Sequence, residues 1–322
     1  MACLYLVVPC FNEEEIIENT NYVISQKLQE LIEKGIINSN SKVLYVDDGS
    51  KDSTWKKIQK ISQDNKFVTA IRLARNEGHQ NALMAGMRCA YDYADIVITI
   101  DADLQQDINA LEEFILKYHS GKDIVFGIRN SRKTDGLIKK VTAIAFYRLM
   151  KLLGTDTITN HADYRLMSHD ALTALFEYRE TQLFLRGIIA SMGFETDVVK
   201  FDVQERKAGK SKYSMWKMIT LALNGITSLS IRPMHLVFYL GVTALLISTG
   251  MIIYNIYIYS QGIAVQGWAS LLCSIWFLGG LTLASIGIIG EYIGKTYMET
   301  KQRPLYFIKE KVNLNEQSRT SK

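Results

Sequence analysis

Short runs of aliphatic and β-branched residues alternate with longer amphipathic segments from residue 1 to about residue 205. The short runs predict β-strands, which we expect at Leu4–Val8, Lys42–Val46, Val68–Leu73, Ile96–Ile100 and Ile124–Gly127. The longer segments predict helices, which we expect at Glu13–Lys34, Ser53–Gln63, Gln80–Tyr93, Ile108–Ser120 and Leu137–Leu153. Strands that alternate with helices form βαβ units. The pattern therefore predicts an α/β domain with a mostly parallel sheet that helices cover on both faces.

A second pattern begins near residue 232. No Asp, Glu, Lys or Arg lies between Arg232 and Glu291. Two apolar segments in this stretch, Met234–Ile258 and Trp268–Gly290, are each close to the roughly 20 residues that cross a bilayer as a helix. Lys and Arg flank the outer ends of the pair, whereas the loop Tyr259–Gly267 carries no charge. The positive-inside rule then predicts a multi-pass protein of the plasma (inner) membrane, with both termini in the cytoplasm.

Residues 213–231 connect the two patterns. Their apolar positions recur at helical spacing, at Trp216, Ile219, Leu223 and Ile226. We expect an amphipathic helix that lies in the membrane interface, with an ordinary domain helix as the alternative. The chain then divides into a soluble α/β domain (1–205), a basic loop with the interfacial helix (206–232), two membrane helices (233–292) and a cytoplasmic tail (293–322), of which we expect the polar end, Lys309–Lys322, to be disordered.

Composition excludes several classes of protein. A net charge of +4 over 322 residues gives no reason to expect nucleic-acid binding. The four cysteines, Cys3, Cys10, Cys89 and Cys273, share no close spacing, so no zinc or disulfide framework is indicated. The apolar start of the chain is short, lacks a basic lead and runs into Pro9, which is unlike a signal peptide. We therefore expect the soluble domain to stay in the cytoplasm.

The most informative polar motif follows the fourth predicted strand. Asp101 and Asp103 close this apolar run as Asp-Ala-Asp, and alternate residues of an extended strand share one face. Two carboxylates that converge favour a cation, and oxygen ligands favour Mg²⁺ or Mn²⁺, completed by substrate phosphates. Gln105 could complete the ligand set. The alternative is that Asp103 or Asp107 caps the next helix.

Polar residues also follow the first three predicted strands. After the first, Asn12 can cap the next helix, and Glu13 suits its first turn. After the second, the adjacent carboxylates Asp47 and Asp48 repel each other, so a cation or the donors of a ribose or base are expected nearby. After the third, Arg72 could bind a phosphate in bidentate fashion or could simply be solvated.

Two further polar segments lie beyond the strands. Residues 161–166, His-Ala-Asp-Tyr-Arg-Leu, indicate little by themselves. The segment Arg206–Lys212 is basic, contains Gly209 and precedes the predicted membrane helices. It could be a patch for anionic lipids, or it could clamp the phosphate of one lipid.

Taken in order, these segments resemble the family 2 glycosyltransferases with a GT-A fold, a Rossmann-like α/β fold. Within that family they resemble the polyprenyl-phosphate glycosyltransferases. The resemblance covers nearly the whole chain, and it is carried by VPCFNEEE, VDDGSKDST, RLARNEGHQNAL, DADLQ, FGIRNSR, HADYRL, ERKAGKSKY and the two C-terminal apolar segments.

The resemblance implies roles for particular side chains. Nucleotide-sugar binding is implied for Pro9, Asn12, Glu13, Asp47, Asp48, Arg72 and Asp101. Metal binding, of Mg²⁺ or Mn²⁺, is implied for Asp101, Asp103 and Gln105. Binding of the acceptor phosphate is implied for Arg129, Arg132, Arg206, Ser211 and Lys212. Asp163 is implied near the reacting centre, so that Asp101, Asp103 and Asp163 are the expected catalytic residues. Cys10 and His161 depart from the family's usual residues, which bears on donor choice.

The function that the resemblance implies is inverting sugar transfer from a nucleoside diphosphate to polyprenyl (undecaprenyl) phosphate at the cytoplasmic face of the membrane. Glucose from UDP-glucose is the first expectation. UDP-galactose, UDP-amino sugars and GDP-mannose are alternatives, and a homo-oligomer is possible. A polysaccharide synthase of family 2 is the competing enzyme, but the chain lacks its Gln-x-x-Arg-Trp motif and its additional spans. A non-catalytic membrane scaffold would not need the Asp-Ala-Asp pair, and a channel is disfavoured because the spans contain no carboxylates.

Overall fold

The computed structural model describes residues 1–130, 161–180, 184–202, 232–261 and 267–314. Within these ranges the chain forms two compact units. The first unit contains the sheet and includes the chain again from Pro304 onward, and the second contains the two long C-terminal helices. The predicted helices at 137–153 and 213–231 lie outside the described residues.

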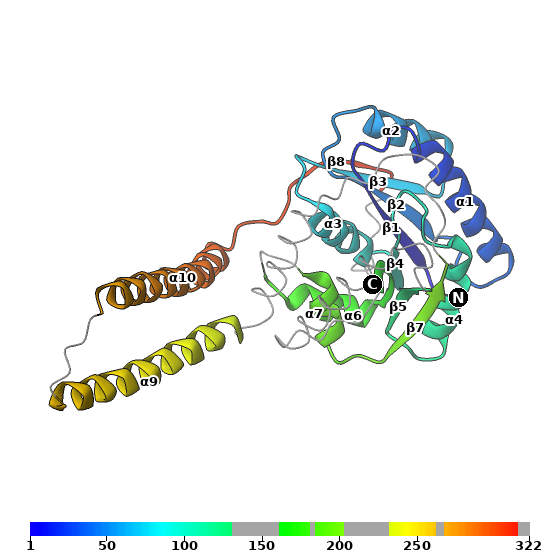
Figure 1. The fold of residues 1–322 in the computed structure, drawn as a ribbon. Helices are drawn as coiled ribbons and strands as arrows, with labels where there is room; N and C mark the ends of the chain where they lie inside the picture. Colours follow the sequence, from blue (N-terminus) through cyan, green and yellow to red (C-terminus); the bar gives the residue numbers. More distant parts are fainter. Residues whose placement is uncertain (131–160, 181–183, 203–231, 262–266, 315–322) are drawn as a thin grey trace. The chain divides into compact units, whose positions relative to one another are not determined.

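The first unit is built on one eight-stranded sheet with the order β7-β5-β6-β4-β1-β2-β3-β8 (Figure 1). The strands are β1 (Leu4–Cys10), β2 (Lys42–Asp47), β3 (Val68–Leu73), β4 (Ile96–Thr99), β5 (Ile124–Arg129), β6 (His161–Ser168), β7 (Thr196–Phe201) and β8 (Ile308–Val312). The central strands β3, β2, β1 and β4 pair in parallel, as do β5 and β7, whereas β6 and β8 are antiparallel to their neighbours. The expectation of a mostly parallel α/β sheet is confirmed.

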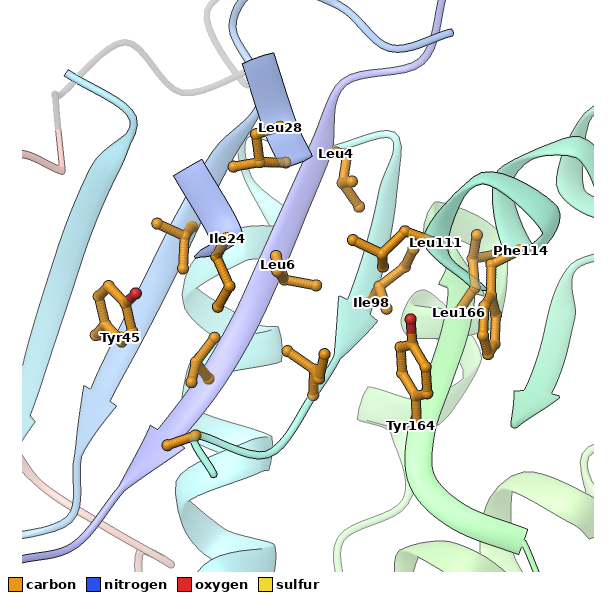
Figure 2. Packing of buried hydrophobic residues seen from close by; sticks show 14 of the residues in the cluster. Leu4, Leu6, Ile24, Leu28, Tyr45, Ile98, Leu111, Phe114, Tyr164 and Leu166 are labelled. Atoms are coloured by element: carbon orange, nitrogen blue, oxygen red, sulfur yellow. The ribbon is translucent and has the colours of Figure 1, made fainter. Parts of the chain in front are cut away.

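Helices cover both faces of this sheet, because side chains along each strand alternate between two apolar cores. In β1, Leu4 and Leu6 belong to one core, and Tyr5 and Val7 to the other. The first core (Figure 2) includes side chains of α1 (Ile17–Glu33), α2 (Thr54–Asp64) and α4 (Leu111–His119), the last preceded by a short 3₁₀ turn, η1 (Ile108–Ala110). The second includes side chains of α3 (His79–Tyr91), α6 (His169–Glu177) and α7 (Leu185–Ser191).

Helix α3 packs unusually close to the sheet. A Cβ atom at Gly86 would lie 2.4 Å from Cγ1 of Val7 and 2.8 Å from Cγ2 of Val46. Only a residue without a side chain fits there, since such distances are well inside van der Waals contact. The close approach fixes α3 against β1 and β2. Its first residue, His79, is thereby held near the carboxyl ends of these strands.

All five predicted strands are present: each starts at the predicted residue, Val68–Leu73 also ends there, and the other four end one or two residues away. Three more strands join the sheet: β6, β7 and β8. The expectation that Lys309–Lys322 is disordered is wrong for its first residues, because Ile308–Val312 pairs with β3. The strand is short, and its Lys and Glu residues resemble a solvated tail. Tertiary pairing with β3 decides its conformation, which sequence periodicity over so few residues does not reveal.

The second unit consists of α9 (Arg232–Ser260) and α10 (Trp268–Thr300), which contain the two predicted apolar segments. Many large apolar side chains on both helices are exposed, among them Phe238, Leu246, Ile275 and Phe277. By length and composition, Phe277–Thr300 could cross a membrane, whereas the apolar stretch of α9, Val237–Met251, is shorter than such a span. The described helices thus contain one candidate span, and the predicted two-span hairpin is not confirmed.

Candidate functional site

The candidate site lies where the parallel strands β1, β2 and β4 end. In open α/β sheets, ligands bind beyond the carboxyl ends of such strands. Asn12 follows β1, Asp48 follows β2 and Asp101 follows β4. Because these strands are neighbours in the sheet, the polar motifs predicted from the sequence lie together at the carboxyl ends of the central strands.

The Asp-Ala-Asp motif is a turn and not the end of a strand. Strand β4 ends at Thr99, and the N–H of Leu104 donates to the carbonyl oxygen of Asp101 at 3.3 Å. Leu104 adopts a positive φ of 49°. Asp103 accepts a hydrogen bond from the backbone N–H of Gln105 at 3.2 Å. The expectation that extended geometry aligns the two carboxylates is therefore wrong, because residues 101–104 form a turn.

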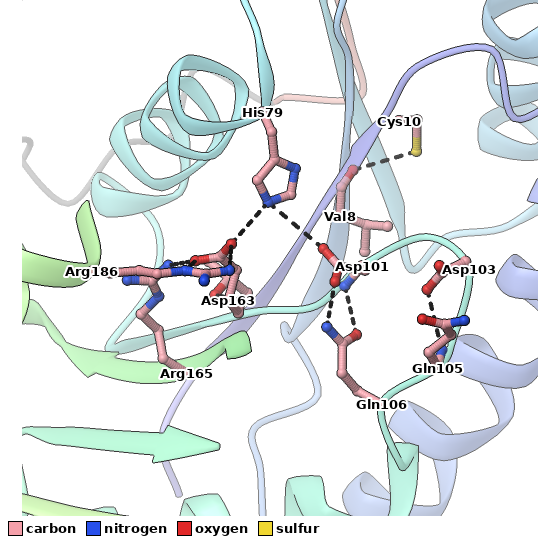
Figure 3. Close-up of polar contacts among 11 residues, drawn as sticks. Val8, Cys10, His79, Asp101, Asp103, Gln105, Gln106, Asp163, Arg165 and Arg186 are labelled. Atoms are coloured by element: carbon pink, nitrogen blue, oxygen red, sulfur yellow. Dashed lines mark hydrogen bonds and ion pairs between the residues drawn. The ribbon is translucent and has the colours of Figure 1, made fainter. Parts of the chain in front are cut away.

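Gln106 fixes the Asp101 side of this turn (Figure 3). Its Oε1 accepts the backbone N–H of Asp101 at 2.9 Å, and its Nε2 donates to Oδ2 of Asp101 at 2.5 Å. Gln106 is almost completely buried. Gln105 was predicted as a site residue and Gln106 was not, because two adjacent glutamines cannot be told apart by their order in the chain. Only the conformation of the turn decides that Gln106 is the buried one.

A second carboxylate, Asp163 on β6, lies at the centre of a cationic cluster (Figure 3). Arg165 donates from Nη2 to Oδ1 of Asp163 at 2.5 Å. Arg186 on α7 donates from Nε to Oδ1 at 3.2 Å and from Nη2 to Oδ2 at 2.8 Å. Burial by itself raises the pKa of Asp163, but hydrogen bonding to His79 and the charges of Arg165 and Arg186 hold it well below its usual range. Asp163 is therefore ionised, and both of its carboxylate oxygens accept hydrogen bonds from arginines of the protein itself.

His79 connects the two carboxylates. Its Nε2 lies 3.4 Å from Oδ2 of Asp163 and 3.7 Å from Oδ1 of Asp101. Burial lowers the pKa of His79, but the hydrogen bond to Asp163 and the charge of Asp101 outweigh it and raise the pKa. The imidazole side chain is 42% exposed, so it stands at the open side of the cluster.

Arg165 supports Asp163 from within the protein. It is completely buried, and its Nε and Nη1 atoms have no hydrogen-bond partner among the described residues. A buried guanidinium without full hydrogen bonding is costly unless a carboxylate compensates its charge. Asp163 supplies that charge, so the pair depends on both members.

Asp48 anchors a loop of the protein. Its two carboxylate oxygens accept the backbone N–H groups of Glu77 (2.8 Å) and Gly78 (3.0 Å), which lead directly into α3. Burial raises the pKa of Asp48, and these two hydrogen bonds oppose the shift. Asp48 thus fixes the segment that carries His79.

Asp47 is completely buried beside Asp48. Its Oδ2 lies 3.1 Å from Nε of Arg72, and its Oδ1 accepts the N–H of Ser50 at 3.4 Å. Burial raises its pKa, and Ser50 and Arg72 oppose that shift. Both carboxylates of the predicted nucleotide motif therefore contact donors from the protein itself.

The residues at the end of β1 form the part of the site next to Asp47 and Asp48. Pro9 lies in β1 opposite Val46, and Asn12 has a positive φ of 54°. The N–H of Asn12 donates to Oγ of Ser50 at 3.0 Å, and Glu13 donates from its N–H to Oγ1 of Thr54 at 2.9 Å. Helix α1 begins at Ile17, so the alternative that Asn12 caps this helix is wrong.

The oxygen atoms of the turn fit a hard divalent cation. Asp101 and Asp103 supply carboxylates and Gln105 an amide oxygen, which is the ligand chemistry of Mg²⁺ and Mn²⁺. The described residues contain no group of three or more His, Cys, Asp and Glu side chains arranged around one metal position. An ion held by the turn would therefore need substrate oxygens, as Mg²⁺ commonly does.

Of the predicted acceptor residues, Arg129 is described. It ends β5 and is partly exposed. The other four, Arg132, Arg206, Ser211 and Lys212, lie outside the described residues.

The family to which this α/β domain belongs follows from its match to a protein-family model. The family model for glycosyl transferase family 2 matches residues 5–176, which include all of β1 except Leu4, the Asp101 turn and Asp163. The chain belongs to glycosyl transferase family 2. The predicted GT-A-like α/β domain and the predicted glycosyltransferase activity agree with this membership.

Relatives of this glycosyltransferase match almost its full length. The uncharacterized glycosyltransferase YkoT of Bacillus subtilis (strain 168) is 50% identical over 95% of this chain and 90% of its own. The prophage bactoprenol glucosyl transferase homolog of Escherichia coli (strain K12) is 39% identical over 94% of this chain and 97% of its own. The bactoprenol glucosyl transferase of Shigella phage SfX is 40% identical over 94% of this chain and 98% of its own.

Four side chains at the site of this glycosyltransferase were not predicted from the sequence: His79, Gln106, Arg165 and Arg186. Two of them stand inside segments that carried the resemblance, His79 in RLARNEGHQNAL and Arg165 in HADYRL. Their positions within these motifs were a usable signal. Arg186 lies in a segment without any polar pattern, so only the approach of α7 to β6 reveals it.

Proposed function

We propose that this glycosyltransferase moves glucose from UDP-glucose to a polyprenyl phosphate, with inversion of the anomeric carbon, at the cytoplasmic face of the membrane. The observation that carries the proposal is the near full-length similarity, at 39–40% identity, to proteins named bactoprenol glucosyl transferase. Full-length similarity matters because it includes the apolar helices as well as the sheet.

In this proposal the nucleotide lies over the carboxyl ends of β1, β2 and β4. Asn12 and Glu13 would line one wall and Arg72 the other, while the buried Pro9, Asp47 and Asp48 would shape these walls from within the protein. The hydrogen bonds that Asp48 accepts from Glu77 and Gly78 support a structural role for Asp48, because they fix the backbone that shapes the wall. A rigid wall presents its polar groups to the nucleotide already in place, which lowers the cost of ordering them when the donor binds.

Asp101, Asp103 and Gln105 would hold Mg²⁺ or Mn²⁺ together with the donor diphosphate. The ion would neutralise charge that develops on the departing nucleoside diphosphate. Gln106 then holds Oδ2 of Asp101 in place. His79 lies close to both Oδ1 of Asp101 and Oδ2 of Asp163 and connects the two carboxylates. These contacts reduce the reorganisation that the site must undergo when the donor binds.

The acceptor needs orientation more than deprotonation. A phosphate monoester has a second pKa of about 6 and is mostly dianionic at neutral pH. One of its oxygens attacks the anomeric carbon, while the bond from that carbon to the diphosphate oxygen breaks and UDP leaves. We therefore assign Asp163 a positioning role, which its low pKa and its contacts with two arginines support. Arg129, Arg132, Arg206, Ser211 and Lys212 would hold the acceptor phosphate.

The membrane arrangement completes the proposal. Helices α9 and α10 would form a two-span hairpin, and the segment at 213–231 would lie in the interface. The exposed apolar side chains of α9 and α10 support contact with lipid. A polyprenyl phosphate has its charge at the headgroup level, where the basic residues 206–212 could reach it.

A direct assay tests this function. The full chain is purified in detergent and incubated with undecaprenyl phosphate and radiolabelled UDP-glucose, UDP-galactose, UDP-N-acetylglucosamine or GDP-mannose. We expect label in the lipid fraction with UDP-glucose and a metal ion. Label in a polymer would favour the synthase alternative, and no transfer from any donor would contradict the proposal.

A further inference from the structure

The chain returns from the apolar helices to the sheet. After α10, strand β8 pairs antiparallel with β3, and Glu310 lies directly opposite Arg72. The connection is well anchored: the N–H of Ala74 donates to the carbonyl of Phe307 at 2.8 Å, and Nδ2 of Asn313 donates to the carbonyl of Ser62 at 2.5 Å. Strand β8 is therefore a fixed part of the sheet at the edge beside β3.

Glu310 has three partners from two elements. It accepts hydrogen bonds from Nε1 of Trp55 at 3.1 Å and from Nε2 of Gln59 at 3.3 Å, both on α2. Its Oε1 lies 3.3 Å from Nη1 of Arg72. Trp55 is buried, and a buried indole N–H requires an acceptor. The carboxylate of Glu310 meets that requirement and orients Arg72 at the same time.

Arg72 connects Glu310 to the residues that are predicted to bind the nucleotide. Its guanidinium lies 5.8 Å from the ring centre of Trp55, its Nη2 donates to the carbonyl of Ser50 at 3.3 Å, and its Nε lies 3.1 Å from Asp47. Asp47 is completely buried, so its charge depends on Arg72 for compensation. Ser50 in turn accepts the N–H of Asn12. One continuous chain of contacts thus runs from β8 to the motifs after β2 and β1.

We infer that Glu310 is a positioning residue of the donor site: by holding Arg72 against Asp47 and Ser50, the strand that follows the apolar helices completes the nucleotide wall. The inference rests on the proposed function, in which the nucleotide lies at these strand ends. Without Glu310, the long side chain of Arg72 regains rotamer freedom, and Asp47 loses a fixed counter-charge. Nucleotide binding is then weakened, while groups at the reacting carbon are untouched.

The experiment measures UDP binding by calorimetry and transfer kinetics with the full chain in detergent. Glu310→Gln keeps the size of the side chain and removes its charge, and Glu310→Ala removes the contact. Lys309→Ala and Lys311→Ala are matched controls, because both residues are exposed neighbours on β8. We expect the Glu310 variants to raise the Kd for UDP about three- to tenfold and to leave kcat within about twofold of the unaltered protein. The two controls should bind UDP normally.

A double-substitution cycle separates positioning from general damage to the fold. If Glu310 acts through Arg72, Glu310→Gln should add less than about twofold to the Kd in an Arg72→Ala background. An unchanged Kd in both Glu310 variants would overturn the inference, as would full additivity with Arg72→Ala. Failure of the unaltered protein to bind UDP would instead refute the proposed donor, and the two failures are therefore distinguishable. Thermal unfolding of every variant identifies any that is misfolded, and the conservative Glu310→Gln then decides.

Discussion

Gln106 holds Asp101 from two directions, through the backbone N–H of Asp101 and through its carboxylate. The result is a carboxylate whose orientation is set before any ligand arrives. This arrangement resembles the support that outer residues give to metal ligands in general, where they fix both position and charge.

The first prediction follows from this contact. Gln106→Ala should lower kcat about 10- to 100-fold, because Asp101 loses the hydrogen bonds that orient it while residues 101–104 of the turn are unchanged. Thermal unfolding in the same detergent serves as the control for global stability. Wild-type turnover by a folded Gln106→Ala protein would show that Asp101 does not need this contact.

The second prediction concerns the metal. Asp103→Ala should abolish transfer and leave the protein folded and membrane-bound, because the loss of a ligand costs several kcal/mol of transition-state stabilisation. Chelation of divalent ions should likewise stop the unaltered enzyme, and Mg²⁺ or Mn²⁺ should restore it. The assay is run at limiting metal concentration. Near-normal turnover of Asp103→Ala under these conditions would refute its role as a ligand.

The third prediction concerns the stability that Asp163 contributes. Asp163→Asn should destabilise the domain by about 3–5 kcal/mol, because Arg165 stays buried without its counter-charge. Asp64→Asn, at an exposed position, is the matched control. Unfolding is followed by circular dichroism with temperature. Equal stability of the two variants would mean that the ion pair contributes little.

The third prediction also has a pH-dependent form. The pKa of Asp163 is lower in the folded protein than the value of about 3.9 expected when unfolded. Its contribution to stability is therefore complete above about pH 4 and is lost as the pH falls through the lower, folded value. Activity should accordingly show no acidic limb from Asp163 between about pH 5 and pH 8, which a kcat–pH profile measures. A limb that vanishes in Asp163→Asn would assign it a base role instead.

The fourth prediction concerns the acceptor. Arg206→Ala should raise KM for a short-chain polyprenyl phosphate or lower kcat, and should leave UDP binding unchanged. A lipid phosphate needs charge-assisted donors, and arginine offers a rigid pair of them. A general lipid patch would contribute about 1 kcal/mol per charge to membrane attraction and nothing in detergent. Normal turnover of Arg206→Ala in detergent would therefore favour the patch.

The fifth prediction concerns topology. A single cysteine introduced in the loop 259–267 should react with a membrane-impermeant thiol reagent added outside intact cells, whereas one introduced near the C-terminus should not. The Lys and Arg residues that flank α9 and α10 motivate this arrangement. Labelling at the C-terminus would be incompatible with two spans and cytoplasmic termini.

Much of this fold was predictable because it depends on local order. The five strands, their apolar character and the parallel sheet follow from residue periodicity, since each strand must bury side chains on both faces. The same periodicity identified the strand ends that carry Asn12, Asp47 and Asp101. Family motifs then indicated the chemistry, because they preserve residue type and order along the chain.

What the sequence by itself determined is therefore the order of the elements, the polar residues at the ends of strands and the apolar C-terminal segments. Only the tertiary structure decided which side chains meet. The turn after β4 selects Gln106, the close approach of α3 at Gly86 carries His79 to Asp163, and pairing with β3 carries Glu310 to Arg72. The physical reason is that the His79 and Glu310 contacts join elements distant in the chain, and the Gln106 contact depends on the backbone conformation of the turn, so no periodic pattern of residues encodes them.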